Sequence, residues 1–292
     1  MQIIELAGCS GVGKSTLLES FLLGYTGSEK FIATDERARH LITKQILKER
    51  NSKWQYLFFP EVKIPLFNNL LCRKILEKEY KKELFKQYRN WEECLKIMFV
   101  RHSDPKKNLR LLYRYSALLS RMESQSFYQR FPLDYFMVLD SGLFHKVAGI
   151  LLLLDQQQID EAINLIYSKI PVIPYGLIHL KASPSIIHER IFGRESLKCE
   201  YLKEFKEIKR DKVYKRTMLE EKINQIGVKI YEKRGVKVYE IDASENISIQ
   251  LQKVTGFLDG LNNREGKICR SIGTRNAAGA DIPEYMRCSA ND

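Results

Sequence analysis

The chain has 292 residues, of which 44% are hydrophobic and 29% charged, and its formal net charge is +12. These proportions are typical of a soluble globular protein. The six cysteines form no C-x-x-C pair, which argues against structural zinc or a disulfide framework and indicates a reducing compartment. The most apolar segment, 147–154, is far shorter than the roughly 20 residues of a membrane-spanning helix. Because Met1 is followed by no signal-peptide pattern, we expect a cytoplasmic protein without a membrane span.

The first expected element is a strand at residues 2–7. It runs directly into Gly8-x-x-x-x-Gly13-Lys14-Ser15, and a leucine-bearing helix follows at 15–23. A strand before this motif and a helix after it are the context of a phosphate-binding loop (P-loop), whose backbone N–H groups bind phosphate oxygens. We predict Lys14 at the β- and γ-phosphates of a nucleoside triphosphate and Ser15 on Mg²⁺. The predicted nucleotide-binding residues are Gly8, Cys9, Ser10, Gly11, Val12, Gly13, Lys14, Ser15 and Thr16.

Strands and helices alternate along most of the remaining chain. Strands are expected at 31–34, 135–139, 175–181 and 236–241, and helices at 41–49, 65–129, 185–192 and 201–233. This alternation predicts an α/β fold with a parallel sheet. Residues 41–130 lack strand signals, so we interpret them as a mostly helical insertion. The sequence predicts one domain at 1–262 and a flexible tail at 263–292, because the tail has few large apolar residues.

The positive charge is concentrated within the predicted insertion. Between Leu71 and Arg114 there are thirteen Lys and Arg residues and six acidic ones. Two interpretations stay open. This stretch is either the solvated face of a helical insert or a surface for an anionic macromolecule.

Charged residues follow three of the expected strands, where ligands gather in a parallel sheet. After the second strand, Asp35 and Glu36 are candidates for the carboxylate that orients an acceptor hydroxyl, although a helix cap explains them too. After the third strand, Asp140 is the candidate second contact to Mg²⁺. After the fourth, Arg190 and Arg194 share one helical face and are candidates for a lid over the transferring phosphates.

Together, these features resemble the thymidylate kinase-like branch of the P-loop nucleoside and nucleotide kinases. The resemblance covers residues 1–260. It rests on Gly8–Thr16, Thr34-x-Glu36, Asp140, the segment 177–194 and the closing Ile-Asp-Ala-Ser at 241–244. It implies a P-loop NTPase fold with a parallel five-stranded core, ATP and Mg²⁺ as cofactors, and transfer of the γ-phosphoryl group. Two departures concern the acceptor: Ser141 replaces the family's arginine, and the insert before the third strand is much longer.

The favoured function is therefore a Mg-ATP-dependent kinase for a nucleotide or nucleoside-like acceptor, with Lys14, Asp35, Glu36, Arg190 and Arg194 as catalytic candidates. Nucleotide, nucleoside, sugar and nucleic-acid 5′-hydroxyl acceptors stay open, because all need the same donor half. The alternative is a regulatory P-loop ATPase, or a nucleotide-binding interaction protein, that uses the basic insert to bind a macromolecular partner.

Overall fold

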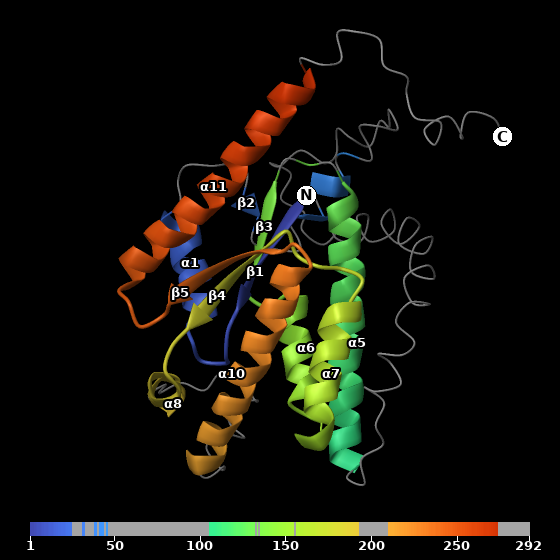
Figure 1. The fold of residues 1–292 in the computed structure, drawn as a ribbon, viewed down its shortest axis with the longest axis vertical. Helices are drawn as coiled ribbons and strands as arrows, with labels where there is room; N and C mark the ends of the chain where they lie inside the picture. Colours follow the sequence, from blue (N-terminus) through green and yellow to red (C-terminus); the bar gives the residue numbers. More distant parts are fainter. Residues whose placement is uncertain are drawn as a thin grey trace, which may run out of the picture. The chain divides into compact units, whose positions relative to one another are not determined.

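A computed structural model of the chain describes residues 1–24, 31–32, 38–39, 41–43, 45, 105–131, 133, 135–154, 156–192 and 210–273. The chain divides into two compact units, Met1–Gln250 and Leu251–Asp292. All the described strands belong to the first unit (Figure 1). Within the described ranges, every helix falls short of the length or the apolar character that crossing a bilayer requires.

The first unit is built on a sheet of five parallel strands in the order β2-β3-β1-β4-β5. The strands are β1 (Gln2–Ala7), β2 (Phe31–Ile32), β3 (Phe136–Leu139), β4 (Gly176–Lys181) and β5 (Lys237–Asp242). The central strand β1 pairs Ile4 with Val138 on one side and with Gly176 on the other. It is buried from Ile3 to Ala7, as expected for a strand with neighbours on both edges and helices on both faces. The predicted α/β class and parallel five-stranded sheet flanked by helices are confirmed.

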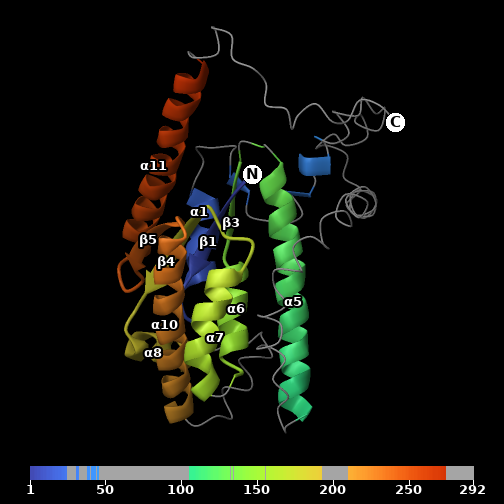
Figure 2. The same cartoon turned by 45° about the vertical axis from the view of Figure 1, so that its right-hand side comes forward.

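Four helices pack against one another on one face of the sheet: α5 (Pro105–Arg130), α6 (Leu143–Leu151), α7 (Gln156–Lys169) and α10 (Arg210–Lys233). The helix α1 (Lys14–Gly24) follows the P-loop. Crossovers between parallel strands are right-handed, and the β1-to-β2 connection runs opposite to the others. This rule places α1 on the other face, in agreement with Figures 1 and 2. The helix α8 (Pro184–Phe192) follows β4.

The core between the sheet and these four helices is aromatic at its centre. Phe144, Tyr167 and Tyr231 come from α6, α7 and α10, and their ring centroids lie 5.1–5.6 Å apart in tilted and edge-to-face pairs. All three side chains are fully buried. This cluster fixes α6 and α10 against each other, and both helices contribute residues next to the P-loop.

The helix α11 (Ile247–Gly273) begins in the first unit and continues into the second. Its apolar residues recur at helical spacing, at Leu251, Val254, Leu258 and Leu261. The predicted division into a domain at 1–262 and a tail at 263–292 stays a prediction. The predicted helical insertion is described mainly at α5, and most of residues 41–104 lie outside the described ranges.

Candidate active site

The P-loop has the backbone geometry that its glycines permit. Gly8, Gly11 and Gly13 have φ values of +133°, +88° and +117°, which L-residues rarely adopt. At Gly8 the packing is equally restrictive, because a Cβ atom there would lie 2.5 Å from the backbone oxygen of Leu180. The loop therefore approaches the end of β4 as closely as its backbone allows. Its conformation depends on glycine at this position.

Lys14 lies over the loop that precedes it. Its Nζ donates hydrogen bonds to the backbone oxygens of Gly8, at 2.7 Å, and Cys9, at 3.0 Å. The side chain is buried, with 9% of its surface exposed. A buried ammonium at the start of α1, where the helix dipole also favours anions, is suited to hold phosphate oxygens. This role for Lys14 remains a prediction.

Ser15 and Asp140 meet although 125 residues separate them. Ser15 lies in the first turn of α1 and Asp140 directly follows β3, and the Ser15 Oγ donates to the Asp140 Oδ2 at 3.0 Å. The pairing of β1 with β3 places the ends of both strands together. A hydroxyl and a carboxylate oxygen are the hard donors that Mg²⁺ prefers, so these two side chains fit the predicted ion. Their role as ligands stays a prediction.

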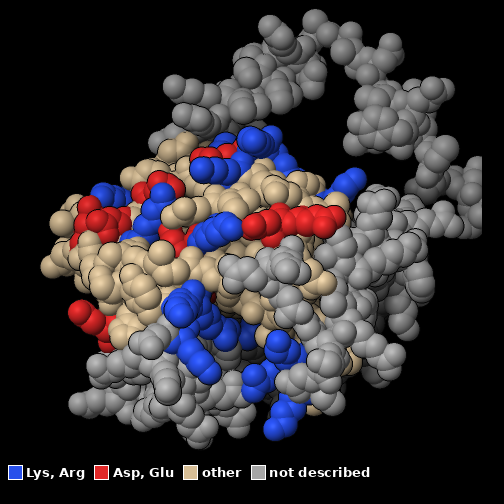
Figure 3. Space-filling model, turned by 60° about the horizontal axis from the view of Figure 1, so that its bottom comes forward, with Lys and Arg blue, Asp and Glu red and all other residues tan. Residues whose placement is uncertain are grey.

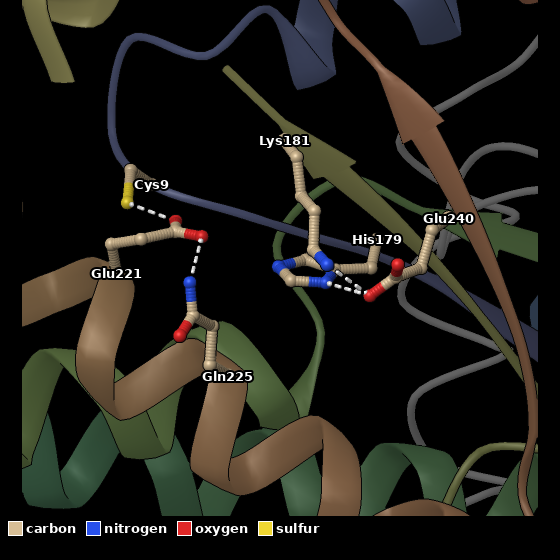
Figure 4. A network of polar contacts seen from close by, with 6 residues as sticks. All are labelled: Cys9, His179, Lys181, Glu221, Gln225 and Glu240. Atoms are coloured by element: carbon tan, nitrogen blue, oxygen red, sulfur yellow. Dashed lines mark hydrogen bonds and ion pairs between the residues drawn. The ribbon is translucent and has the colours of Figure 1, made fainter. Parts of the chain in front are cut away.

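A buried face of α10 holds the other end of the loop. The Glu220 Oε1 accepts hydrogen bonds from the backbone N–H of Ser10, at 3.0 Å, and from its hydroxyl, at 3.1 Å. The Cys9 thiol donates to Glu221 at 3.2 Å (Figure 4). It accepts from the Asn224 side chain at 3.6 Å. Glu220 and Asn224 are almost fully buried. The residues Cys9 and Ser10, predicted to bind nucleotide, are thus fixed to α10.

Burial and the neighbouring Glu220 and Glu221 carboxylates raise the pKa of the Cys9 thiol. The thiol is fully buried and stays protonated at neutral pH. Because the thiolate is the reactive form, Cys9 is not a nucleophile in this environment. It serves as a small buried residue of the loop.

A cavity of about 560 Å³ opens beside the loop on the β4–β5 side. It is lined by Gly11, Val12, Gly13, Thr16, Arg190, Ala243, Glu245, Ile247 and Gln250. The guanidinium of Arg190 donates to the backbone oxygens of Val12, at 2.7 Å, and Ala243, at 2.8 Å. Arg190 therefore ties α8 to the loop and to the end of β5. Its predicted role over the transferring phosphates is neither tested nor contradicted by these contacts.

Basic side chains gather on the opposite, β3 side of the loop. His145 and Lys146 lie in the first turn of α6, and Arg114 and Arg121 lie two turns apart on α5. Burial and the charges of Lys14, Lys146 and Arg114 lower the pKa of His145 to about 3. Burial and the charges of Arg121 and Arg114 also lower the pKa of Lys146, while Asp140 acts in the opposite direction. The four side chains are termed the basic cluster below; the charge of Lys14 acts on His145, and that of Asp140 acts on Lys146.

The start of α6 is fixed by a carboxylate from the central strand. The Glu5 side chain accepts from the backbone N–H groups of Leu143 and Phe144, both at 2.8 Å, and from Gln125 at 2.6 Å. Gly142, the N-cap residue, offers no side chain for this purpose, and a Cβ there would collide with Glu5. Glu5 is fully buried, and this burial raises the pKa of its carboxyl.

A second polar network lies on β4 and β5. His179 is fully buried and its Nδ1 lies 3.4 Å from Glu240, which also pairs with Lys181 (Figure 4). Burial lowers the pKa of His179. This network links β4 to β5 at the edge of the sheet. Among the described residues, no contact between this network and the P-loop is recorded.

Three of the predicted catalytic residues, Asp35, Glu36 and Arg194, lie outside the described residues. So does most of the basic stretch at 71–114, of which the structure describes the α5 part. The predicted roles of these residues therefore stay predictions.

The chain was compared with known families, curated proteins and solved structures. No family model and no curated protein matches it. Among solved structures, it is similar to deoxyadenosine kinase from M. mycoides with bound dATP, at 16% identity and a TM-score of 0.42, over 88% of this chain and 99% of that one. The same enzyme with the products dCMP and dCDP (15%, 0.42) and with bound dCTP (13%, 0.41) matches over the same shares. These values describe a distant likeness, and nothing about substrates follows from them.

Sequence reasoning missed the residues that support the loop from a distance. Glu220, Glu221 and Asn224 lie on a long charged helix, and nothing in their local pattern marks them as contacts of the P-loop. Glu5 did carry a signal, because a single acid in an otherwise apolar central strand must find buried donors. The basic cluster carried a partial sequence signal, because Arg114 and Arg121 are seven residues apart and therefore lie on one helical face.

Proposed function

We propose that this protein is a Mg-ATP-dependent phosphotransferase, a kinase whose acceptor is a nucleotide or nucleoside-like molecule. The observation that carries the proposal is the meeting of three parts: the glycine-shaped P-loop, Lys14 above it, and the Ser15–Asp140 pair at 3.0 Å. These parts come from separate elements that converge at the carboxyl end of β1. Each part suits a different need of phosphoryl transfer.

In the proposed mechanism the loop amides and Lys14 hold the β- and γ-phosphates of ATP. Charge develops between the leaving and transferring groups, and Lys14 stabilises it. A Mg²⁺ ion held by Ser15 and Asp140 supplies further charge neutralisation when it is bound. We assign the nucleoside part of ATP to the cavity next to Arg190, because loop residues and Ala243 after β5 line it.

The two sides of the loop then have different tasks. The donor nucleoside takes the β4–β5 side, and the acceptor approaches from the β3 side, where the basic cluster lies. This division allows the acceptor to reach the γ-phosphate opposite the leaving ADP, as in-line displacement requires. Asp35 and Glu36, which follow β2 in the sequence and lie outside the described residues, stay proposed as acceptor-side carboxylates.

A transfer assay tests the proposal. Purified protein is incubated with Mg²⁺ and ATP labelled at the γ-phosphate, together with separate nucleosides, nucleotides, sugars and an oligonucleotide with a 5′-hydroxyl. We expect the label to move to at least one small acceptor, and to do so only with Mg²⁺. Binding of ATP without transfer to any acceptor, together with a stable macromolecular partner, would contradict the proposal in favour of a regulatory ATPase.

A further inference from the structure

His179 is a buried histidine on β4, the strand next to the one that leads into the P-loop. In the register of these strands it stands beside Ala7, the last residue of β1. Side chains two residues apart on a strand share a face, so His179 lies on the same face as Leu177. Leu177 belongs to the core between the sheet and the helices α5, α6, α7 and α10. His179 is fully buried there, and a polar side chain in such a core needs buried partners.

One ring nitrogen of His179 has a partner that fixes where its proton lies. The Nδ1 atom is 3.4 Å from Oε1 of Glu240, the residue beside it on β5, and the same oxygen is 2.5 Å from the Nζ of Lys181. The hydrogen bond from Lys181 lowers the pKa of Glu240, so this carboxylate is ionised and accepts. The proton of the neutral ring therefore lies on Nδ1. Within the described part of the chain, the other nitrogen, Nε2, has no hydrogen-bond partner.

Nε2 faces the carboxylate that holds the P-loop to α10. Figure 4 shows this side of the His179 ring turned toward Glu221, whose charge acts on His179. Glu221 accepts hydrogen bonds from the Cys9 thiol, at 3.2 Å, and from Gln225, at 3.1 Å. A neutral ring presents an electron pair toward this carboxylate, whereas a protonated ring presents an N–H donor. The charge of His179 therefore decides whether the ring repels Glu221 or holds it.

The titratable groups around His179 act on it in opposite directions. Burial lowers its pKa and so does the charge of Lys181, whereas Glu221 and Glu240 raise it. The titratable side chain of β1 is Glu5, two residues before the one beside His179, and burial raises the pKa of its carboxyl. The balance leaves the pKa of His179 below its ordinary value of 6.5. The ring is therefore neutral at pH 7 and gains a proton at lower pH.

We propose that His179 is a positioning residue of the P-loop, which acts through Glu221 on the attachment of Cys9 to α10 and tightens that attachment when it is protonated. Lys and Arg side chains gather on the lower side of Figure 1, which Figure 3 brings forward, and such exposed cations attract an anionic ligand directly. His179 is fully buried, so its effect on a nucleotide passes through the loop instead. The inference deepens the proposed function, on which its consequence for nucleotide binding rests.

Modification of Cys9 tests the inference without any nucleotide. A pyridyl disulfide, which reacts with thiols even at acid pH, is added to the full chain from about pH 5 to about pH 8, and the Cys9 peptide is quantified by mass spectrometry. The wild type is compared with His179→Gln, whose side chain does not titrate. We expect the ratio of variant rate to wild-type rate to increase about threefold or more as the pH falls below 6.5, because the wild type gains a donor for Glu221. A ratio that is constant across this range would overturn the inference.

The matched control is His188→Gln, which removes a partly exposed histidine from α8. Its rate of Cys9 modification, divided by the wild-type rate, should not depend on pH. A pH dependence equal to that of His179→Gln would contradict the assignment to His179.

Two carboxylate variants trace the path from His179 to the loop. In Glu221→Gln the group facing Nε2 loses its charge, so the further change His179→Gln should no longer alter the pH dependence of Cys9 modification. Glu240 is 51% exposed, so Glu240→Gln should fold even if substitution of the buried His179 does not allow folding. Because Glu240 raises the pKa of His179, this variant should gain protection of Cys9 at a lower pH than the wild type. An unchanged profile in Glu240→Gln, or an effect of His179→Gln that persists in Glu221→Gln, would overturn the inference.

Mg-ATP affinity, measured by calorimetry on the same proteins, shows whether this attachment matters for the site. The wild type should gain affinity relative to His179→Gln as the pH falls below 6.5, and comparison at each pH cancels the titration of ATP itself. A relative affinity that does not change with pH would contradict the positioning role. Mg-ATP binding with a Cys9 rate ratio independent of pH overturns the inference and leaves the kinase proposal intact. Protection of Cys9 that depends on His179, without Mg-ATP binding at any pH, contradicts the kinase proposal and supports the link from His179 to the loop.

Discussion

Asp140 contributes a full negative charge to the predicted Mg²⁺ site, whereas Ser15 contributes a neutral oxygen. Asp140→Asn keeps the shape of the side chain and removes that charge. We expect the Mg²⁺ concentration for half-maximal transfer to rise about tenfold or more, because hard cations depend on anionic oxygens. The measurement is transfer rate against free Mg²⁺ at fixed ATP. Asp160→Asn, which alters an exposed carboxylate on α7, is the control. An unchanged Mg²⁺ dependence would refute the assignment of Asp140.

Glu220 offers a second test at the residue scale, with Cys9 as the reporter. In Glu220→Ala the Ser10 N–H loses its buried acceptor, at a cost of about 1–3 kcal/mol, and the Cys9–Ser10 turn is released from α10. We expect faster alkylation of Cys9, followed by mass spectrometry of its peptide, and weaker ATP binding. Glu220→Gln keeps an acceptor oxygen, so its effect should be much smaller.

The matched control for this experiment is Glu232→Ala, which removes an exposed carboxylate from the same helix. The buried Cys9 has a raised pKa, so its slow reaction in the wild type is the reference. If Glu220→Ala and Glu232→Ala react alike, α10 does not hold the loop.

Glu5 acts at the scale of elements, because it joins the central strand to the start of α6. Glu5→Leu leaves the N–H groups of Leu143 and Phe144 without their acceptor. At about 1–3 kcal/mol for each buried donor, we expect a loss of about 2–6 kcal/mol in the free energy of unfolding, measured by urea denaturation. Glu123→Leu on α5 is a control at a less buried acid. A loss below about 1 kcal/mol would contradict the capping role.

The pKa of Glu5 also predicts the sign of a pH effect. Its carboxyl has a pKa raised above the ordinary value of 4.5 by burial. The Gln side chain of Glu5→Gln does not titrate. The free energy of unfolding of the wild type, taken relative to that of Glu5→Gln, should therefore be highest below about pH 4.5 and should fall as pH rises through the raised pKa of Glu5. The free energies of unfolding of both proteins across this range give the difference. A difference that grows with pH would show a lowered pKa instead.

Elements with strong local signals were predictable from the sequence. The strand before the P-loop was predicted as 2–7 and is observed as Gln2–Ala7, and the third to fifth strands differ by one residue at their ends. The helices α7 and α11 were not predicted, although the apolar spacing in α11 from Leu251 to Leu261 carries the helical period. Short turns and mixed polar segments flank α7 and α11, so the sequence did not mark where these helices begin and end.

At the scale of the whole molecule, the sequence predicted which strand ends form the centre but not what supports it. The contact of Ser15 with Asp140 follows from the expected parallel sheet. The contacts of Ser10 with Glu220 and of Glu5 with Gln125 span 210 and 120 residues. They join the loop to α10 and β1 to α5, on helix faces that no local pattern specifies. Such pairings depend on tertiary packing, here on the aromatic cluster between α6, α7 and α10.

Lys14 is the residue on which the whole account depends most directly. The decisive measurement is the rate of γ-phosphoryl transfer by Lys14→Ala under saturating Mg-ATP, compared with the wild type. Loss of this charge should lower kcat by about a hundredfold or more, by analogy with the removal of other transition-state donors, while circular dichroism shows an intact fold. A folded Lys14→Ala variant with unchanged turnover would contradict the P-loop as the centre of catalysis.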